Sequence, residues 1–219
     1  TRRSQFGFGP ITPASHLFVR NNLPTPPASL IAQGDDWSFD VSGCAREGSL
    51  TLADLKRMKS RTVATVLQCS GNGRDFFPHN PSGSQWAVGA AGCVLWTGVT
   101  VADIFEQFGG VKSDLSYLTA TGGEELPEGV NQDAVVVERS VPIEKGLKDC
   151  LLVWEMNGAP LPMIHGGPVR LIVPGYFGVN NVKWVRRLAA TTDESGAKIQ
   201  QSGYRMRAEG LAGGPEHPS

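Results

Sequence analysis

One of the four cysteines stands where a thiolate could do chemistry. Cys69 follows the apolar, β-branched run of residues 62–67 and precedes Gly71 and Gly73, with Arg74 five positions further on. Glycines let the backbone approach a ligand closely, and a nearby cation lowers the pKa of a thiol. The segment therefore predicts a nucleophile, a soft metal ligand, or a cysteine that merely occupies a turn. The residues alone leave these three interpretations open.

The other three cysteines carry no such signal. Cys44, Cys93 and Cys150 lie in apolar, strand-like segments, so we expect small buried side chains there and leave their disulfide state open. No two cysteines have C-x-x-C spacing, which gives no support to a zinc ribbon, a thioredoxin-like motif or c-type haem attachment.

Three further segments concentrate hydrogen-bond donors. Arg20 is followed by two asparagines, which suits either anion binding or a surface turn. Arg170 lies inside an apolar strand, and a buried guanidinium needs an anionic or multiply hydrogen-bonding partner. His165 precedes a double glycine and is either a satisfied loop histidine or a ligand-binding one. Residues 178–184 carry two asparagines and Lys183, which could cradle a phosphate or form an ordinary hairpin loop.

The elements that would position these residues belong to an α+β fold. Alternating or β-branched runs predict strands at residues 37–41, 62–67, 115–120, 134–138, 150–154, 169–173 and 182–188. Capping-box-like patterns at Thr51 and Thr100 predict short helices that end near Lys59 and Phe108. A long polar loop is expected from Gly71 to Ser84. We therefore predict mixed β-sheets with short helices.

Composition sets further bounds. Twenty Lys and Arg face 21 Asp and Glu, which gives a net charge of −1 and no basic excess for nucleic acid. No apolar stretch approaches the roughly 20 residues of a membrane span. We expect an extended N-terminal arm at residues 1–34, a core at residues 35–190 and a linker-like segment at residues 191–219.

Taken together, the segments resemble a known family. The matching motifs are Phe18-Val-Arg-Asn, Leu67-Gln-Cys-x-Gly-Asn, Glu155-Met-Asn-Gly-x-Pro-Leu-Pro, and Pro168-Val-Arg-Leu-x-Val-Pro-Gly followed by Val182-Lys-Trp. In this order they resemble the molybdopterin domain of sulfite oxidases and sulfite dehydrogenases over nearly the whole chain. The resemblance implies a molybdenum–molybdopterin cofactor (Moco) with Cys69 as the protein ligand to the metal.

The resemblance also implies roles for other residues. The expected cofactor-binding residues are Phe18, Val19, Arg20, Asn21, Asn22, His165, Arg170, Asn181, Val182 and Lys183. Arg20 and Arg74 are expected to bind an anionic substrate, and Trp86 to line its pocket. Trp154 is expected near the metal, at the place of a family tyrosine. An indole N–H can donate a hydrogen bond but cannot replace a phenol in proton transfer.

The implied reaction is oxidation of sulfite to sulfate by oxygen-atom transfer, with electrons passed to a separate acceptor such as cytochrome c. A periplasmic location and a homo-oligomer are the matching expectations, and the family's C-terminal dimerisation domain is expected to be absent from this chain. One alternative is a molybdoenzyme of the same fold that acts on another sulfur compound or oxo-anion, such as a sulfane dehydrogenase. A non-catalytic binding module and a thiol hydrolase are alternatives of other classes.

Overall fold

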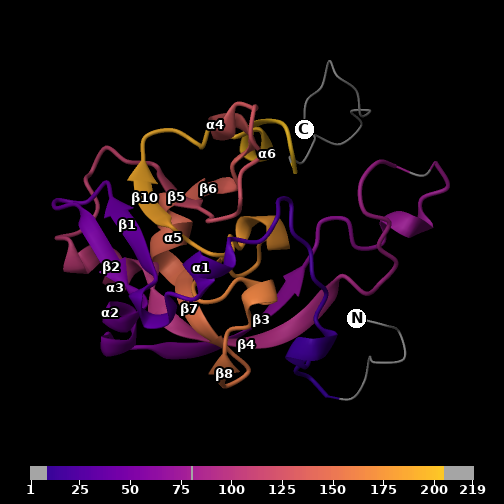
Figure 1. Ribbon diagram of the computed structural model, residues 1–219, viewed down its shortest axis with the longest axis horizontal. Coiled ribbons are helices and arrows are strands. Elements are labelled where there is room, and N and C mark those ends of the chain that lie inside the picture. The colour runs from indigo at the N-terminus through magenta and orange to yellow at the C-terminus, as the bar shows by residue number, and fades with distance from the viewer. Residues whose placement is uncertain (1–8, 80, 205–219) are drawn as a thin grey trace.

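The structure is a computed structural model that describes residues 9–79 and 81–204. Its strands form two five-stranded sheets (Figure 1). The first has the order β2 (Gly48–Thr51), β1 (Ser38–Ser42), β10 (Arg187–Thr191), β5 (Tyr117–Thr121), β6 (Glu138–Pro142). The second has the order β3 (Arg61–Gln68), β4 (Ala91–Thr100), β7 (Leu151–Met156), β8 (Ala159–Pro160), and β9 (Arg170–Ile172) also pairs with β7. Only the β1–β10 pair, among these, is parallel.

The helices are short. The α-helices are α1 (Ala28–Ile31), α2 (Leu52–Arg57), α3 (Val101–Gln107), α4 (Gln132–Val135), α5 (Ile143–Asp149) and α6 (Lys198–Gln201). The 3₁₀ turns are η2 (Ala14–His16), η3 (Gly34–Asp36), η4 (Arg74–Phe76), η5 (Met163–His165) and η6 (Gly178–Asn180). Among the described residues, no helix is long and apolar enough to cross a bilayer.

The main apolar core lies between the two sheets. Phe39 of β1 and Leu188 of β10 pack in it with Leu152 of β7, and α3 contributes Phe105. A second cluster, which includes Trp96 and Met156, packs on the opposite face of β4 and β7. Because β7 is buried on both of its faces, its run of apolar residues is nearly unbroken, as expected for a central strand.

The two predicted capping sites are confirmed. Thr51 Oγ1 accepts a hydrogen bond from the backbone N–H of Asp54, and the Asp54 carboxylate accepts one from the backbone N–H of Thr51, so that α2 begins with a capping box. Thr100 accepts in the same way from the Asp103 N–H and begins α3. Each side chain satisfies a backbone donor that the first helical turn leaves without an internal partner.

Two strand predictions were wrong in position. Residues 134–138 are not one strand, because the Asn131 side chain accepts from two backbone N–H groups and starts α4, and β6 begins only at Glu138. The last predicted strand, residues 182–188, begins later, at Arg187. Trp184 interrupts it with a left-handed backbone at φ 51°.

The predicted C-terminal linker is also corrected for the part that the structure describes. Residues 192–204, which we call the strap, include α6 and pack against β6. Ser195 and Gln200 are buried there. Their hydrogen bonds to β6 give this polar stretch a fixed place, which composition could not reveal.

Residues 205–219 lie outside the described ranges, as do residues 1–8 of the predicted arm. The described part of that arm packs through Leu17 and through a hydrogen bond from Thr12 N to Cys93 O of 2.7 Å.

Candidate functional site

Cys69 follows the last residue of β3 and is held by the backbone of the neighbouring strand. Its N–H donates to Ala90 O at 2.9 Å. Asn72 closes the turn, because its N–H donates to Cys69 O at 3.0 Å and its Oδ1 accepts from Ala90 N at 2.9 Å. The two ends of the long loop between β3 and β4 are thus joined beside the half-buried thiol, so that the sheet fixes its position.

Two cavities meet at Cys69. The inner cavity is lined by Phe18, Arg20, Asn21, Asn22, Leu67, Cys69, Ser70, Glu124, Val137, His165, Arg170, Gly178, Val179, Asn181, Val182, Lys183 and Tyr204. The outer cavity is lined by Arg20, Cys69, Ser70, Gly71, Arg74, Ser82, Gly83, Ser84, Phe177, Ser202, Gly203 and Tyr204. Four residues are common to both: Arg20, Cys69, Ser70 and Tyr204.

Arg170 is the most buried cation of the inner cavity, with 1% of its surface exposed. Its guanidinium donates to His165 O at 2.6 Å and Asn181 O at 2.9 Å, and it stacks on the Trp96 ring. Burial lowers the pKa of Arg170 to about 9. Its Nε has no hydrogen-bond partner among the described residues. A buried donor of this kind indicates room for an acceptor that the protein itself does not supply.

Lys183 and Glu124 are two further ionisable residues of the inner cavity. Lys183 Nζ donates to Asn21 Oδ1 and to Ile164 O, both at 2.7 Å. Burial, reinforced by the charge of Arg170, lowers the pKa of Lys183 to about 7. Burial raises the pKa of Glu124 to about 7, and its Oε2 is buried without a partner among the described residues. Sequence reasoning missed Glu124, because it lies in a loop without a recognisable pattern.

His165 and Asn181 shape the cavity with side chains that already have protein partners. His165 is 4% exposed, its Nε2 lies 2.9 Å from Ala14 O, and burial lowers its pKa. Asn181 Oδ1 accepts from Val173 N at 2.8 Å and its Nδ2 donates to Phe177 O at 3.0 Å. These contacts fix the backbone whose carbonyls hold Arg170.

The segment of residues 18–22 lines mainly the inner cavity, and only Arg20 of this segment also lines the outer one. Phe18 lines the inner cavity, and its ring meets the Trp86 ring edge-on at 5.9 Å between centroids. Asn22 accepts a hydrogen bond from the Tyr204 hydroxyl at 3.2 Å. Val19 is 38% exposed and lines neither cavity.

Arg74 lines the outer cavity together with Cys69, and its role in binding an anionic substrate stays a prediction. Its Nη1 donates to Ser84 O at 3.2 Å, and its guanidinium passes between Gly71 and Gly83. A Cβ at either glycine would come within 3 Å of the guanidinium, which would have to shift, and Gly83 also has a φ of 102°, which favours glycine. Trp86 does not line either cavity; it packs behind Phe18 and has a buried Nε1 without a hydrogen bond in the described chain.

Trp154 does not lie where the sequence placed it. It is 8% exposed, belongs to the main core and lines neither cavity. The reason is the alternation along β7: Leu152 and Trp154 face the main core, whereas Leu151 and Val153 face the second cluster. Trp154 therefore packs as a core aromatic residue, and no part of the outer cavity depends on it.

The donor set of the inner cavity fits a phosphate-bearing, polar heterocyclic group. Arg170 and Lys183 are cations for a phosphate, and the two unpartnered buried atoms, Arg170 Nε and Glu124 Oε2, offer a donor and an acceptor. Within residues 9–79 and 81–204, no three His, Cys, Asp or Glu side chains gather into a metal site.

Comparison with known proteins identifies the family. Residues 23–199 match the model of the oxidoreductase molybdopterin binding domain. The chain belongs to this family. The chain is 35% identical over 205 residues to sulfite oxidase from Gallus gallus and 32% identical over 199 residues to mitochondrial sulfite oxidase from Drosophila melanogaster, in each case over 89% of its own length. It is also 31% identical over 202 residues to the NADH nitrate reductase of Spinacia oleracea.

A solved structure is similar as well. The sulfane dehydrogenase SoxCD from Paracoccus pantotrophus superimposes with a TM-score of 0.74 and 27% identity, over 91% of this chain and 48% of that one. The molybdopterin-domain fold with mixed sheets and short helices is thus confirmed, and so is molybdenum–molybdopterin as the family's cofactor. The chain spans 42% of the length of the Gallus gallus sulfite oxidase and 33% of that of the Drosophila melanogaster enzyme.

Proposed function

We propose that this molybdopterin oxidoreductase oxidises sulfite to sulfate. The observation that carries the proposal is that Cys69 lines both cavities. A cofactor in the inner cavity would meet an anion in the outer cavity at the thiol. The outer cavity contributes Arg20 and Arg74, and a guanidinium binds oxo-anions through several N–H donors in one plane.

The protein's part in the reaction is binding and positioning. The molybdenum cofactor, when bound, supplies two-electron oxygen-atom chemistry. Arg170 and Lys183 would hold its phosphate-bearing end, and Cys69 would ligate the metal. Arg20 and Arg74 would attract sulfite and orient its sulfur toward the junction. In the net reaction, sulfite and water give sulfate, two protons and two electrons.

The electrons require an acceptor, for which we propose a separate protein such as a c-type cytochrome, in the periplasm. No pair of cysteines in this chain has the C-x-x-C spacing of c-type haem attachment.

The deciding experiment is metal and pterin analysis of the purified protein, followed by anaerobic addition of sulfite. We expect molybdenum close to equimolar with protein and bleaching of the oxidised metal's absorption by sulfite. If the protein contains molybdenum that sulfite does not reduce, sulfite is not the substrate, whereas the cofactor assignment still holds.

A second candidate is a dehydrogenase for another sulfur compound. The similarity to SoxCD, a sulfane dehydrogenase, supports it. The same anaerobic titration with thiosulfate, and with nitrate as an oxidant of the reduced protein, separates these substrates. Reduction by thiosulfate at a lower concentration than sulfite would favour the second candidate.

A further inference from the structure

Arg139, in β6, lines neither cavity but bonds to two segments that reach them. It is 6% exposed. Its Nε and Nη2 donate to Asn180 Oδ1 at 3.1 and 3.0 Å, and its Nη1 donates to Ile199 O. A planar guanidinium can hold two groups in fixed relative positions, whereas a lysine ammonium on its flexible stem cannot. Arg139 therefore fixes Ile199, in the strap, relative to Asn180, in η6.

Asn180 belongs to the loop of residues 178–183, which we call the cofactor loop. Five of the six residues of this loop line the inner cavity, and Asn180 is the exception because its side chain is turned toward Arg139. The next residue, Asn181, supplies the carbonyl that accepts from Arg170 at 2.9 Å. A shift of Asn180 would therefore move the group that orients the most buried cation of the cavity.

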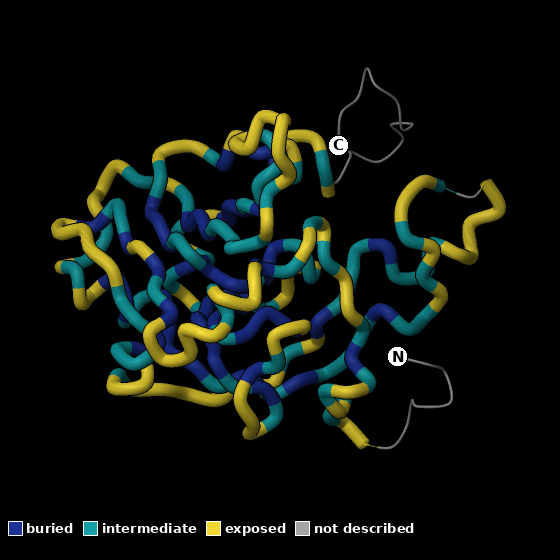
Figure 2. Tube along the Cα trace, in the orientation of Figure 1, coloured by how far each residue is buried: buried dark blue, intermediate teal, exposed yellow. Residues whose placement is uncertain are grey.

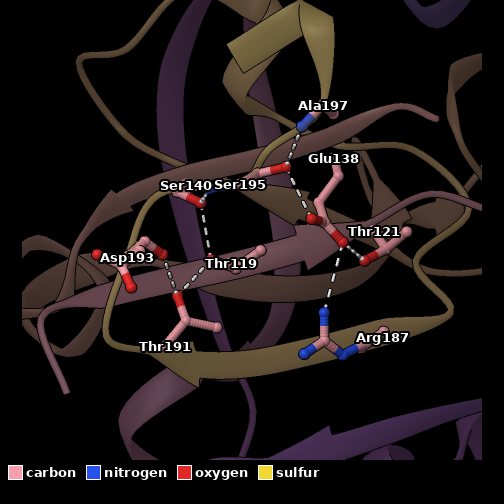
Figure 3. Close-up of polar contacts among 9 residues, drawn as sticks. All are labelled: Thr119, Thr121, Glu138, Ser140, Arg187, Thr191, Asp193, Ser195 and Ala197. Carbon is pink, nitrogen blue, oxygen red and sulfur yellow. Dashed lines mark hydrogen bonds and ion pairs between the residues drawn. The ribbon is translucent and has the colours of Figure 1, made fainter. Parts of the chain in front are cut away.

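The strap is held to the first sheet by hydrogen bonds rather than by apolar packing (Figure 3). Ser195 N donates to Ser140 Oγ at 2.8 Å, and Ser195 Oγ donates to Glu138 Oε1 at 2.7 Å. Ser140 N in turn donates to Gln200 Oε1 at 3.2 Å. The buried residues of the strap are Ser195, Ala197 and Gln200, so the strap, as the structure describes it, buries no large apolar side chain.

A segment of this kind is only weakly stabilised in its docked position. Intramolecular hydrogen bonds contribute little net free energy, because the same groups bond to water when the segment is released. Segments with few buried apolar contacts also open locally more often than core strands do. The end of the strap reaches the site, because Tyr204 lines both cavities. One further contact, such as that between Arg139 and Ile199, should therefore shift the equilibrium between a released and a docked strap.

We propose that Arg139 is a positioning residue that couples docking of the strap to binding of the molybdenum–molybdopterin cofactor. When the cofactor loop holds its ligand, Asn180 is fixed, its amide oxygen fixes the guanidinium, and the guanidinium holds Ile199 and with it α6. A docked strap then strengthens cofactor binding by the same factor by which the cofactor stabilises the docked strap, because coupling between two equilibria is reciprocal. The proposal rests on the family's cofactor and not on sulfite as the substrate.

Hydrogen exchange followed by mass spectrometry tests the coupling in cofactor-loaded and cofactor-free protein. The cofactor-free form is the full chain produced in a host that makes no molybdopterin. We expect the cofactor to slow exchange of the α6 amides of Gln201 and Ser202, which donate to Ala197 O and Lys198 O, by about tenfold. In Arg139→Lys, which keeps the charge but loses the fork, this factor should fall below about twofold, while the slowing within the cofactor loop persists.

A merely structural Arg139 would give a different pattern. Exchange in α6 would then be faster in both forms of Arg139→Lys, and the cofactor would still slow it about tenfold. That result would overturn the proposal, as would an α6 whose exchange the cofactor does not slow in the unaltered protein. Asn180→Ala cuts the same link from the loop side and should give the same loss of coupling, so the test holds even where Arg139→Lys does not fold.

Val99→Ala is the control for a general loss of stability. Val99 belongs to the main core and lines neither cavity, so the variant weakens the fold without touching the strap or the cofactor loop. The effect of the cofactor on α6 exchange should remain in this variant. Its loss there would show that any destabilisation uncouples the strap, and it would overturn the role of Arg139.

Reciprocity predicts an effect from the strap side as well. Ser195→Ala removes an anchor of the strap outside both cavities and should shorten the half-time of pterin loss during gel filtration about threefold. Ser49→Ala, which removes an exposed hydroxyl bonded to Asp40, is the matched control. Equal pterin retention by the two variants would contradict the coupling. Neither measurement needs turnover, so a protein that keeps this coupling but does not oxidise sulfite would overturn only the proposed function.

Discussion

The inner and outer cavities share Cys69 but are built differently. The inner cavity is lined by buried groups near strand ends, and its cations Arg170 and Lys183 have lowered pKa values because of burial. The outer cavity is formed by the loop after β3 and by the end of the strap. Figure 2 shows that much of that loop is exposed, whereas β7 and β9 are largely buried.

This difference separates two tasks. The proposed cofactor-binding groups lie where the core fixes them, whereas the proposed substrate-binding groups lie mostly on loops, which tolerate change without loss of the fold.

The most severe test removes the residue that joins the cavities. Cys69→Ser should leave the protein folded and reduce sulfite oxidation by more than about 100-fold, above the usual cost of losing an outer-shell partner of a metal. Steady-state kinetics with a cytochrome acceptor measures this. Cys93→Ser, at another partly buried thiol, is the control. Near-normal turnover by Cys69→Ser would disprove its assignment as the metal ligand.

A mutation in the outer cavity alone should affect substrate binding. Arg74→Gln removes a charge-assisted contact worth roughly 1.5–3 kcal/mol, so the sulfite KM should rise by about 10- to 100-fold. Cofactor content should not change. Salt should raise the KM of the unaltered protein more than that of the variant, because anions compete with sulfite. Arg46→Gln, whose arginine bonds to Gln107 O and lines neither cavity, is the control. Equal KM values would remove Arg74 from the substrate site.

A pH series probes the inner cavity alone. An anionic phosphate binds the protonated form of Lys183, whose pKa of about 7 in the free protein would rise in the complex. Cofactor affinity should therefore fall above about pH 7 as Lys183 loses its proton and as Glu124, whose pKa is also about 7, becomes an anion, by at most about tenfold per pH unit for each group. Lys183→Arg keeps its charge and should weaken this dependence, whereas Lys145→Arg should not. Pterin retained after gel filtration is the measurement, and a pH-independent affinity in the unaltered protein would contradict the phosphate role.

The smallest effect on activity is expected from a residue of neither cavity. Trp154→Tyr should lower the free energy of unfolding by about 1–3 kcal/mol, because it leaves a gap in the main core. The sulfite KM should stay within about twofold of its original value. Urea unfolding and steady-state kinetics check the two parts. A large change in the sulfite KM without a loss of stability would instead indicate that Trp154 contributes to the substrate site.

Local signals in the sequence singled out Cys69 and Arg74, and the structure places both at the outer cavity, while their roles stay predictions. A β-branched strand that ends in a glycine-rich turn specifies both the position of the thiol and the exposure of the loop. The same is true of α2 and α3, whose first turns are fixed by Thr51 and Thr100. In each case, the deciding interactions join residues only a few positions apart.

Glu124, Tyr204 and Trp154 show where such reasoning ends. Glu124 enters the site because its loop packs against the segment of Lys183, and Tyr204 because the strap is tied to β6. Neither contact has a local signature. Trp154 adjoins a motif that was correctly recognised, but the direction of its side chain depends on which face of β7 meets the main core. A neighbouring motif therefore predicts that a residue belongs to the strand, but it does not predict on which face of the strand the side chain lies.

The parallel pairing of β1 with β10 has a consequence for synthesis on the ribosome. The Trp37 indole N–H donates to Val185 O across 148 residues of sequence, and β10 lies at the centre of the first sheet. A nascent chain without residues 187–191 has no strand to join β1 and β2 to β5 and β6. Because such distant contacts form late in folding, the sheet can be completed only when almost the whole described chain has left the ribosome. The inner cavity, which borders this sheet, is then ready for its cofactor only after translation of this region is finished.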